Sequence, residues 1–262
     1  YENQNGNWVQ IGQDIFGEAA NDNSGLSVSL SADGNVVAIG AYGNDGNGQD
    51  SGHVRLYENQ NGNWVQIGQD IDGEFVDDYS GSSVSLSANG TIVAIGAYNA
   101  KDVNGQATGH VRLYENKNGN WVQIGQDIDG ESVDDYSGYS VSLSANGTIV
   151  AIGADGNDGN GQESGHVRLY ENQNGNWVQI GQDIEGEGQG ETSGGSVSLS
   201  ADGDVVAIGP WLNQGPVRLY QLAGQHIGFA ENIIGSTIVA YLSAADQDSV
   251  DSHTFSLVSD SS

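Results

Sequence analysis

Short apolar runs alternate with polar turns along most of the chain, and no helical periodicity interrupts them. Residues 84–87 alternate apolar and polar side chains, which is the pattern of a strand with one buried face. Residues 92–97 are apolar without alternation and rich in β-branched side chains, which indicates a strand buried on both faces. Residues 110–114 and 121–124 have strand character as well. We therefore expect four strands within residues 80–128.

Glycine-containing dipeptides separate these predicted strands. Asn89-Gly90 lies between the first and second strands, and Asn118-Gly119 lies between the third and fourth. Asn-Gly favours a two-residue hairpin in which both central residues have positive φ. We therefore expect tight antiparallel hairpins at both places. The first of these turns recurs along the chain as Asp33-Gly34, Asn146-Gly147 and Asp202-Gly203.

Two sequence blocks repeat at a nearly constant period. The segment YENQNGNWVQIGQDI begins at Tyr1, Tyr57, Tyr114 (with one lysine) and Tyr170, so the spacings are 56, 57 and 56 residues. Repeats of this length are typical of propellers, solenoids and arrays. The second block, which contains Ser-Val-Ser-Leu-Ser, begins at Ser24, Ser80, Ser137 and Ser193.

Four antiparallel strands repeated in tandem predict the blades of a β-propeller. One blade alone leaves its doubly apolar strand uncovered, so each blade must pack on a neighbour. A long β-solenoid is the structural rival, but its coils are usually shorter than this repeat. We predict an all-β propeller of four-stranded antiparallel blades, with about four repeats of 56–57 residues in residues 1–221.

The two ends of the repeat region leave two arrangements open. Residues 8–15 read as a fourth strand without its first three, and the last copy lacks its fourth strand after residues 217–220. These strands either pair and close a four-bladed ring or remain two unpaired ends of a larger propeller. Their complementarity favours closure slightly. Since the chain starts inside a repeat and stops inside another motif, we expect it to be an internal part of a longer protein.

The repeat block resembles a known family. Asp78-Tyr79-Ser80-Gly81, the Ser-Val-Ser-Leu-Ser strand and the segment Val-Ala-Ile-Gly-Ala at 93–97 are similar to the FG-GAP repeat of integrin α-type β-propellers, in its short bacterial form. Serine stands where the family name has phenylalanine, and the proline of the GAP triplet appears only as Gly209-Pro210. The resemblance covers residues 1 to about 221 and implies a propeller of a cell-surface protein.

The integrin calcium sites do not carry over with this resemblance. In integrins, several blades have an Asp-x-Asp-x-Asp-Gly loop between the FG and GAP strands. Here residues 88–91 form that connection, which is too short to surround a cation. The resemblance therefore implies the scaffold without that metal.

Residues 226–262 resemble the beginning of a cadherin-like domain, a partial β-sandwich. Ala230-Glu231-Asn232 is similar to the opening motif of that family, and residues 245–248 are similar to its Ala-x-Asp-x-Asp motif. The resemblance implies that Glu231, Asp246 and Asp248 are calcium ligands. The alternative is a solvated acidic turn, since the remaining oxygen ligands would lie beyond Ser262.

Composition limits the partners. Six basic residues against 35 acidic ones give a net charge of −29, which repels nucleic acid and anionic lipid and attracts cations. The chain has no cysteine, which is compatible with export but does not prove it. No run of apolar residues is long enough to span a membrane. The turns are built mainly from the 41 glycines, with only 2 prolines.

Three kinds of polar residue recur in the blades. The four repeat arginines, nearly the only cations there, are expected to form structural ion pairs with the acidic turns. The acidic connections at 70–78 and 127–135 are expected to be solvated rather than calcium-binding. The three histidines that begin the third strand are expected to form hydrogen bonds at an edge. These residues are Arg55, Arg112, Arg168, Arg218, His53, His110 and His166.

We expect a non-enzymatic extracellular or cell-surface module for adhesion or binding, with a protein or carbohydrate ligand, calcium as a cofactor and no catalytic residues. Near-identical blades do not supply different groups to one active site, and catalytic motifs such as a nucleophile elbow or a P-loop are absent from the sequence. The alternatives are a polysaccharide-active hydrolase, with paired carboxylates in a central channel, and a purely structural spacer.

Calcium is expected to raise the melting temperature, because divalent cations relieve the repulsion within an acidic chain. In a chain extended past Ser262, the largest share should come from Glu231, Asp246 and Asp248. Calorimetry with and without millimolar calcium checks this on the wild type and on a variant with Asp246→Asn and Asp248→Asn. Unchanged melting would end the calcium hypothesis, and equal stabilisation of both proteins would leave only diffuse screening.

Overall fold

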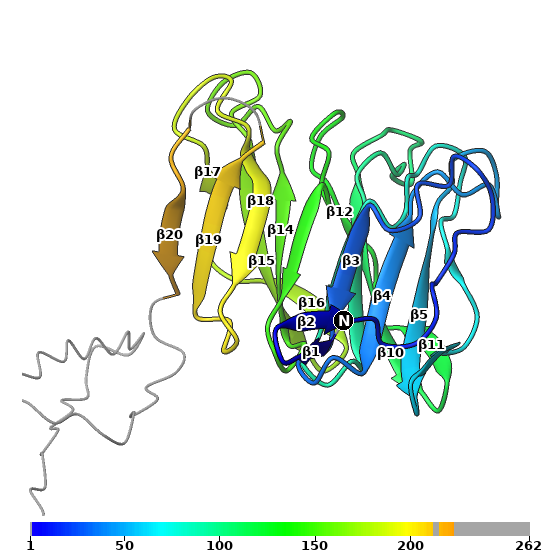
Figure 1. Cartoon of the computed structure of the whole chain (residues 1–262). Helices are drawn as coiled ribbons and strands as arrows, with labels where there is room; N and C mark the ends of the chain where they lie inside the picture. Colours follow the sequence, from blue (N-terminus) through cyan, green and yellow to red (C-terminus); the bar gives the residue numbers. More distant parts are fainter. Residues whose placement is uncertain (1, 212–214, 223–262) are drawn as a thin grey trace, which may run out of the picture. The chain divides into compact units, whose positions relative to one another are not determined.

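The computed structural model describes residues 2–211 and 215–222. These residues contain twenty β-strands and no helix (Figure 1). The chain divides into two units, Tyr1–Gln221 and Leu222–Ser262. The cadherin-like segment predicted for residues 226–262 lies outside the described residues. The predicted all-β class and antiparallel blades are confirmed for the described part of the chain.

Three complete blades have the same topology. In each, four strands pair antiparallel in chain order, and a short fifth strand pairs with the beginning of the third. The fourth and fifth strands therefore pair with different parts of the third strand, and together they form the outer edge of the blade. The strands are β3 (Ser27–Leu30), β4 (Val36–Ala41), β5 (His53–Gln60), β6 (Asn63–Gln66) and β7 (Ile71–Asp72); β8 (Ser83–Leu86), β9 (Ile92–Ala97), β10 (His110–Lys117), β11 (Asn120–Gln123) and β12 (Ile128–Asp129); β13 (Ser140–Leu143), β14 (Ile149–Ala154), β15 (His166–Gln173), β16 (Asn176–Gln179) and β17 (Ile184–Glu185).

Two smaller sheets flank these blades. The fourth blade has three strands, in the order β18-β19-β20. At the start of the chain, β1 and β2 form a separate hairpin, equivalent to the outer end of a blade. Their bounds are β1 (Glu2–Gln4), β2 (Asn7–Val9), β18 (Ser193–Leu199), β19 (Val205–Pro210) and β20 (Arg218–Gln221).

The two Asn-Gly turns differ, although their sequences are alike. At Asn118-Gly119 both residues have positive φ (56° and 85°), and Lys117 pairs with Asn120, so this is the predicted two-residue hairpin. At Asn89-Gly90 only the glycine has positive φ. Here the Asn89 side chain accepts hydrogen bonds from the hydroxyl of Ser87 and the backbone of Thr91. The prediction of a two-residue turn is wrong at this place, because the side-chain bonds stabilise a longer loop.

The hydrophobic core lies between neighbouring blades. One cluster joins the first two blades, and includes Leu56 and Ile95, both essentially inaccessible to solvent. A second cluster joins the second and third blades, and includes Leu113 and Ile152. The predicted burial of the second strand on both faces is confirmed in these blades, where β9 and β14 are almost wholly buried.

The innermost strands also bond directly from blade to blade. Ser85 Oγ accepts a hydrogen bond from the amide of Leu143 (2.9 Å), and Ser83 Oγ donates one to the carbonyl of Gly138 (2.8 Å). The equivalent serines of the first and third blades make the same bonds. The polar half of the Ser-Val-Ser-Leu pattern therefore serves the contact between blades.

One tryptophan of each repeat lies at the outer side of each junction. Trp121 Nε1 donates to the carbonyl of Ile67 in the preceding blade, and Trp177 Nε1 does the same to Ile124 (both 2.9 Å). Trp64 bonds to Ile11 at the same place (3.0 Å). The segment around Ile11 thus lies beside the first blade, where a preceding blade would contribute its outer end.

The described residues do not close a ring of four blades. Strand β2 pairs with β1, and β20 pairs with β19, so residues 8–15 and 217–220 do not complete one another. Apolar side chains at both ends are exposed: Leu30 by 59% in β3 and Leu219 by 70% in β20. The slight preference for closure is therefore wrong for this part of the chain, since residues 8–15 take the position of an outer edge beside the first blade.

Equivalent leucines in the second and fourth blades give a matched test of this packing. Leu113→Ala is expected to lower the free energy of unfolding by about 2–5 kcal/mol, because it leaves a cavity at a fully buried position. Leu219→Ala, at the equivalent exposed position, is expected to change it by less than about 0.5 kcal/mol. Calorimetric melting compares the two variants with wild type. If both variants lost the same free energy of unfolding, Leu219 would be buried in solution and this account of the packing would be wrong.

Candidate functional site

The repeat arginines fasten each blade to the connection that enters it. Arg112 lies 3.3 Å from the carboxylate of Glu74 and donates to the carbonyl of Asp72 (2.9 Å). Arg112 is 4% exposed, so this pair is largely shielded from solvent. The predicted structural ion pairs are confirmed in all four copies. The other pairs are Arg55–Glu18 (3.5 Å), Arg168–Glu131 (3.5 Å) and Arg218–Glu187 (2.9 Å).

The acidic connections are only partly solvated. Asp78 is fully buried, and one of its oxygens accepts bonds from the amides of Glu74 and Phe75 (3.0 and 2.7 Å). Asp135 is also buried and caps the equivalent turn. The prediction of solvated acids is wrong for these residues, because the backbone amides of the turn compensate for the lost water.

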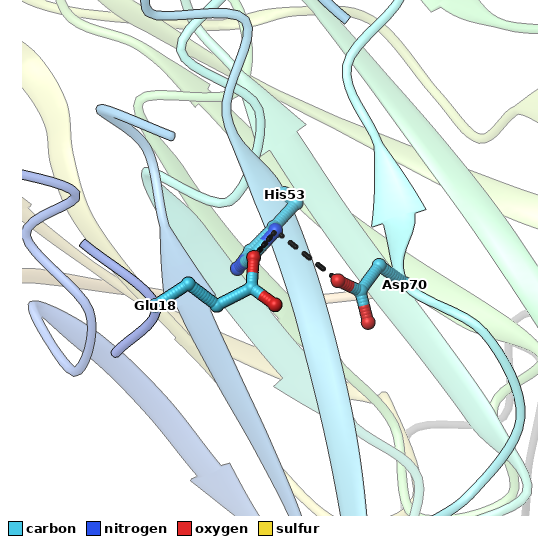
Figure 2. A group of neighbouring side chains, drawn as sticks. All are labelled: Glu18, His53 and Asp70. Carbon is cyan, nitrogen blue, oxygen red and sulfur yellow. Dashed lines mark ion pairs between the residues drawn. The ribbon is translucent and has the colours of Figure 1, made fainter. Parts of the chain in front are cut away.

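The repeat histidines lie inside the blades, beside carboxylates. His53 begins β5 and is 1% exposed. Its Nδ1 atom lies 3.6 Å from Asp70 and 4.0 Å from Glu18. Figure 2 shows the two carboxylates on either side of this nitrogen, one from the entering connection and one from the segment before β7. These separations exceed the range of hydrogen bonds.

The second and third blades repeat this cluster. His110 gathers with Asp127 and Asp129, and its Nδ1 lies 4.0 Å from Asp127. In the third blade the cluster consists of Glu131, His166 and Asp183, with 3.8 Å between His166 Nδ1 and Asp183. Within each of the three clusters, the potential ligand atoms lie within 4.8 Å of one another.

These histidines have incomplete hydrogen bonding. Nε2 of all three has no partner among the described residues, and Nδ1 of His166 has none either. The predicted edge hydrogen bonds are therefore not found. Burial lowers the pKa of His53, and lowers the pKa of His110 and of His166 to about 4. The imidazoles are thus neutral at pH 7, with a lone pair free to bind an electrophile or a metal.

Carboxylates with raised pKa values and two cavities lie next to the first two clusters. Burial raises the pKa of Asp72 and of Asp129, which lie in β7 and β12 beside the histidines. A cavity of about 320 Å³ is lined in part by Asp70 and Asp72. A second, of about 520 Å³, is lined in part by Asp127 and Asp129. These carboxylate pairs recur at equivalent positions in consecutive blades.

A row of aromatic side chains crosses the blades at the ends that carry the variable loops. Some contacts in the row lie within one repeat and others join successive repeats, with ring centroids 5.3–6.1 Å apart. Trp211 is 56% exposed and Tyr136 is 36% exposed. We call the following residues the aromatic row: Tyr42, Tyr79, Tyr98, Tyr136, Tyr139 and Trp211.

Asp155 takes the place of an aromatic residue in this row. It follows β14 as Tyr42 follows β4 and Tyr98 follows β9. Asp155 is 5% exposed, and its Oδ1 has no hydrogen-bond partner among the residues described. Burial raises its pKa to about 6. The third repeat therefore has a buried acid where the first two have a tyrosine.

Sequence reasoning named some of these residues and missed others. The arginines and their pairing with the acidic turns were predicted, whereas the carboxylates beside the histidines were not, because they come from separate segments of the chain. Sequence reasoning did not find the aromatic row, although a tyrosine or tryptophan two positions after Ile-Gly in three copies was a usable signal. The predicted calcium ligands Glu231, Asp246 and Asp248 lie outside the described residues.

Comparison with known proteins gives one family match. Residues 17–57 match the family described as FG-GAP repeat, which covers β3, β4 and the first part of β5. The family predicted from the sequence is therefore found in the first repeat. No significant match exists among curated proteins.

Solved structures show only a distant likeness. The chain is similar to Kuenenia stuttgartiensis hydrazine synthase, with a TM-score of 0.48, 17% identity, and coverage of 75% of this chain and 58% of the other. It is also similar to a putative 6-phosphogluconolactonase from Bacteroides uniformis, with a TM-score of 0.43, 13% identity, and coverage of 76% and 67%. Similarity at this level carries no information about function. In residues 2–211 and 215–222, no helix is long and apolar enough to cross a membrane.

Asp155 predicts a specific pH dependence of stability. Its pKa is about 6 in the folded chain, against 3.8 for an ordinary aspartate, so the folded state binds the proton more tightly. This stabilisation is complete below pH 3.8 and is lost as the pH rises through 6. Between pH 4 and pH 7.5 the residue should remove about 2 kcal/mol from the free energy of unfolding.

Asp155→Asn is expected to remove this part of the pH dependence. Urea unfolding at several pH values measures it, with Asp158→Asn as the control, since Asp158 is an exposed acid of the same loop. The explanation fails if Asp155→Asn and Asp158→Asn leave the pH profile of the wild type equally unchanged.

Proposed function

We propose that the repeat region is a non-enzymatic binding module that acts outside the cell or at its surface. The aromatic row is the observation that carries this proposal. It places partly exposed rings from all four repeats beside the loops that follow the second strand, of which the loop in the second copy has a sequence of its own. Partly exposed aromatic rings provide a large contact area with a polar tip, which suits both sugar rings and protein side chains.

The scaffold and the loops have separate roles in this proposal. The serine bonds, tryptophan bonds and arginine pairs are the same from blade to blade, whereas the loop at 99–109 differs in sequence from the similar loops at 43–52 and 155–165. Variable loops on a rigid scaffold are a common location for recognition. The FG-GAP match at residues 17–57 supports a surface-protein context.

The net charge of the chain narrows the range of possible ligands. The chain carries a net charge of −29, which disfavours nucleic acid and other polyanions. A neutral polysaccharide or a neutral to basic protein surface is compatible with this field. Calcium belongs to the proposal as a stabilising cation, since the resemblance of residues 226–262 to a cadherin-like domain and the density of acids both favour cation binding.

The hydrolase alternative has a specific observation in its favour. Asp127 and Asp129 line a cavity of about 520 Å³, and burial raises the pKa of Asp129, as in a general acid. The same arrangement recurs in the first blade with Asp70 and Asp72. Because an active site needs different groups from different directions, this repetition favours a structural or metal-binding role for the pairs over catalysis.

Substitutions in the aromatic row are expected to weaken ligand binding. Tyr136→Ala combined with Trp211→Ala should reduce affinity at least roughly tenfold, since loss of an aromatic anchor costs about 1–2 kcal/mol or more. Retardation on gels that contain soluble neutral polysaccharides, and binding to arrayed glycans and proteins, measure this. Trp8→Ala is the matched control, because Trp8 is 68% exposed and lies outside the row.

Two results would contradict the proposal. If the double variant kept the full affinity of the wild type, the aromatic row would not be the binding face. If the wild type released reducing ends from a bound polysaccharide and Asp129→Asn abolished that release, the hydrolase alternative would replace the binding module.

A further inference from the structure

We propose that the three histidine–carboxylate clusters of the complete blades bind first-row divalent transition metals of the Zn²⁺ class. The clusters are Glu18–His53–Asp70, His110–Asp127–Asp129 and Glu131–His166–Asp183. This inference is independent of the proposed ligand-binding function, because it concerns residues outside the aromatic row.

The spacing of the donor atoms fits ligands that share one ion. His53 Nδ1 lies 3.6 Å from Asp70 and 4.0 Å from Glu18, and His166 Nδ1 lies 3.8 Å from Asp183. Two ligands at about 2.1 Å from a tetrahedral ion are separated by about 3.4 Å. The observed distances are too long for hydrogen bonds and close to this separation, so a small inward movement of the carboxylates completes the site.

The unpartnered histidine nitrogens point independently to a ligand. His166 is 1% exposed, and neither ring nitrogen has a hydrogen-bond partner among the described residues. Its Nδ1 faces the carboxylate of Asp183. Buried polar groups without partners are uncommon and destabilising. A metal ion bound to Nδ1 gives this lone pair a partner and neutralises the two neighbouring carboxylates.

The donor set decides the class of metal. Calcium prefers six to eight oxygen ligands and rarely takes nitrogen. A neutral imidazole with two carboxylates suits zinc and its neighbours in the first transition row. Burial favours the neutral imidazole at all three positions. The clusters therefore differ in chemistry from the calcium ligands predicted near Asp246.

The neighbouring arginine orients one of the ligands. Glu18 Oε1 pairs with Arg55, while Glu18 Oε2 faces His53. In the third blade, Glu131 Oε1 pairs with Arg168. Outer partners of this kind hold a ligating carboxylate in place. The arginine thus leaves the second carboxylate oxygen directed at the histidine.

The fourth repeat lacks the central ligand. Where the other copies read Gly-His-Val-Arg, the fourth reads Gly-Pro-Val-Arg, so Pro216 stands at the position of His166. No strand equivalent to β17 follows β20 in the described residues. The described part of the chain therefore predicts three equivalents of metal rather than four.

The clusters are open to solvent on one side. The cavities of about 320 and 520 Å³ reach Asp70 and Asp127, which belong to the first and second clusters. Asp70 is 27% exposed and Asp127 is 31% exposed, whereas the histidines behind them are buried. An ion therefore enters from the carboxylate side without opening of the blade.

Metal titration of the untagged 262-residue chain tests the proposal. After removal of metals by a chelator, Zn²⁺ is titrated by calorimetry, and Co²⁺ is titrated by visible absorption, which reports nitrogen and oxygen ligation. About three equivalents are expected per chain, one for each cluster. A large excess of Ca²⁺ should not displace them.

Variants assign the sites. His166→Gln should remove about one equivalent, and Asp183→Asn should weaken the same site while the side-chain shape is kept. Combined His53→Gln, His110→Gln and His166→Gln should remove all three sites. Glu171→Gln is the matched control, since Glu171 lies on the same strand as His166 but outside the clusters, and it should bind as the wild type does.

Circular dichroism confirms that each variant is folded before its titration is interpreted. His226 and His253 remain in every variant, so binding at these residues does not change between them. The proposal is overturned if the wild type binds no Zn²⁺ at micromolar concentration. It is also overturned if folded His166→Gln and the folded triple variant retain the stoichiometry and cobalt spectrum of the wild type.

Discussion

The close approach of the innermost strands of successive blades is the constraint on which the rest of this structure depends. Gly96 in β9 lies so near the carbonyl of Gly138 that a Cβ at this position would overlap it. Gly138 itself has a positive φ of 87°, which favours glycine. Ser83 then bonds to the same carbonyl. Only small residues at these positions allow one backbone to rest on the next.

This close approach of the strands determines where the other contacts between blades form. With the inner strands in register, the apolar residues of β9 and β10 meet the next blade, and Trp177 reaches the carbonyl of Ile124 at the outer side. The connection between blades is held against the next third strand, where Arg112 meets Glu74. The histidine clusters form between the third strand of a blade and the segment at its fifth strand, whereas the aromatic row crosses from one blade to the next.

The sequence predicts most of the fold, for reasons that can be traced to particular residues. Apolar alternation locates the strands, and the constant period reveals the blades because one blade cannot bury its own faces. The loop at Asn89 was not predicted, since its conformation depends on side-chain bonds with Ser87 that Asn118 does not make in its turn. Ring closure depends on contacts between the two ends, about which local patterns contain no information.

The candidate sites were less predictable than the strands. The arginine pairs followed from charge alone, because few cations stand among many acids. The grouping of His53 with Glu18 and Asp70 joins three separate segments, and neither spacing nor composition indicates it. Asp78 reads as a surface acid in the sequence, yet the turn buries it. Such placements follow from tertiary packing, which a repeat pattern does not specify.

Because every junction uses the same glycine, serine and arginine contacts, a blade can be joined to any other blade of its kind. Unequal recombination between repeats of the gene would insert or delete a complete unit of 56 or 57 residues. The inserted unit would form the same contacts with the blades on both sides. No compensating substitution in those blades would be needed. The length of the array can therefore change in one genetic step, while the loops of each copy diverge separately.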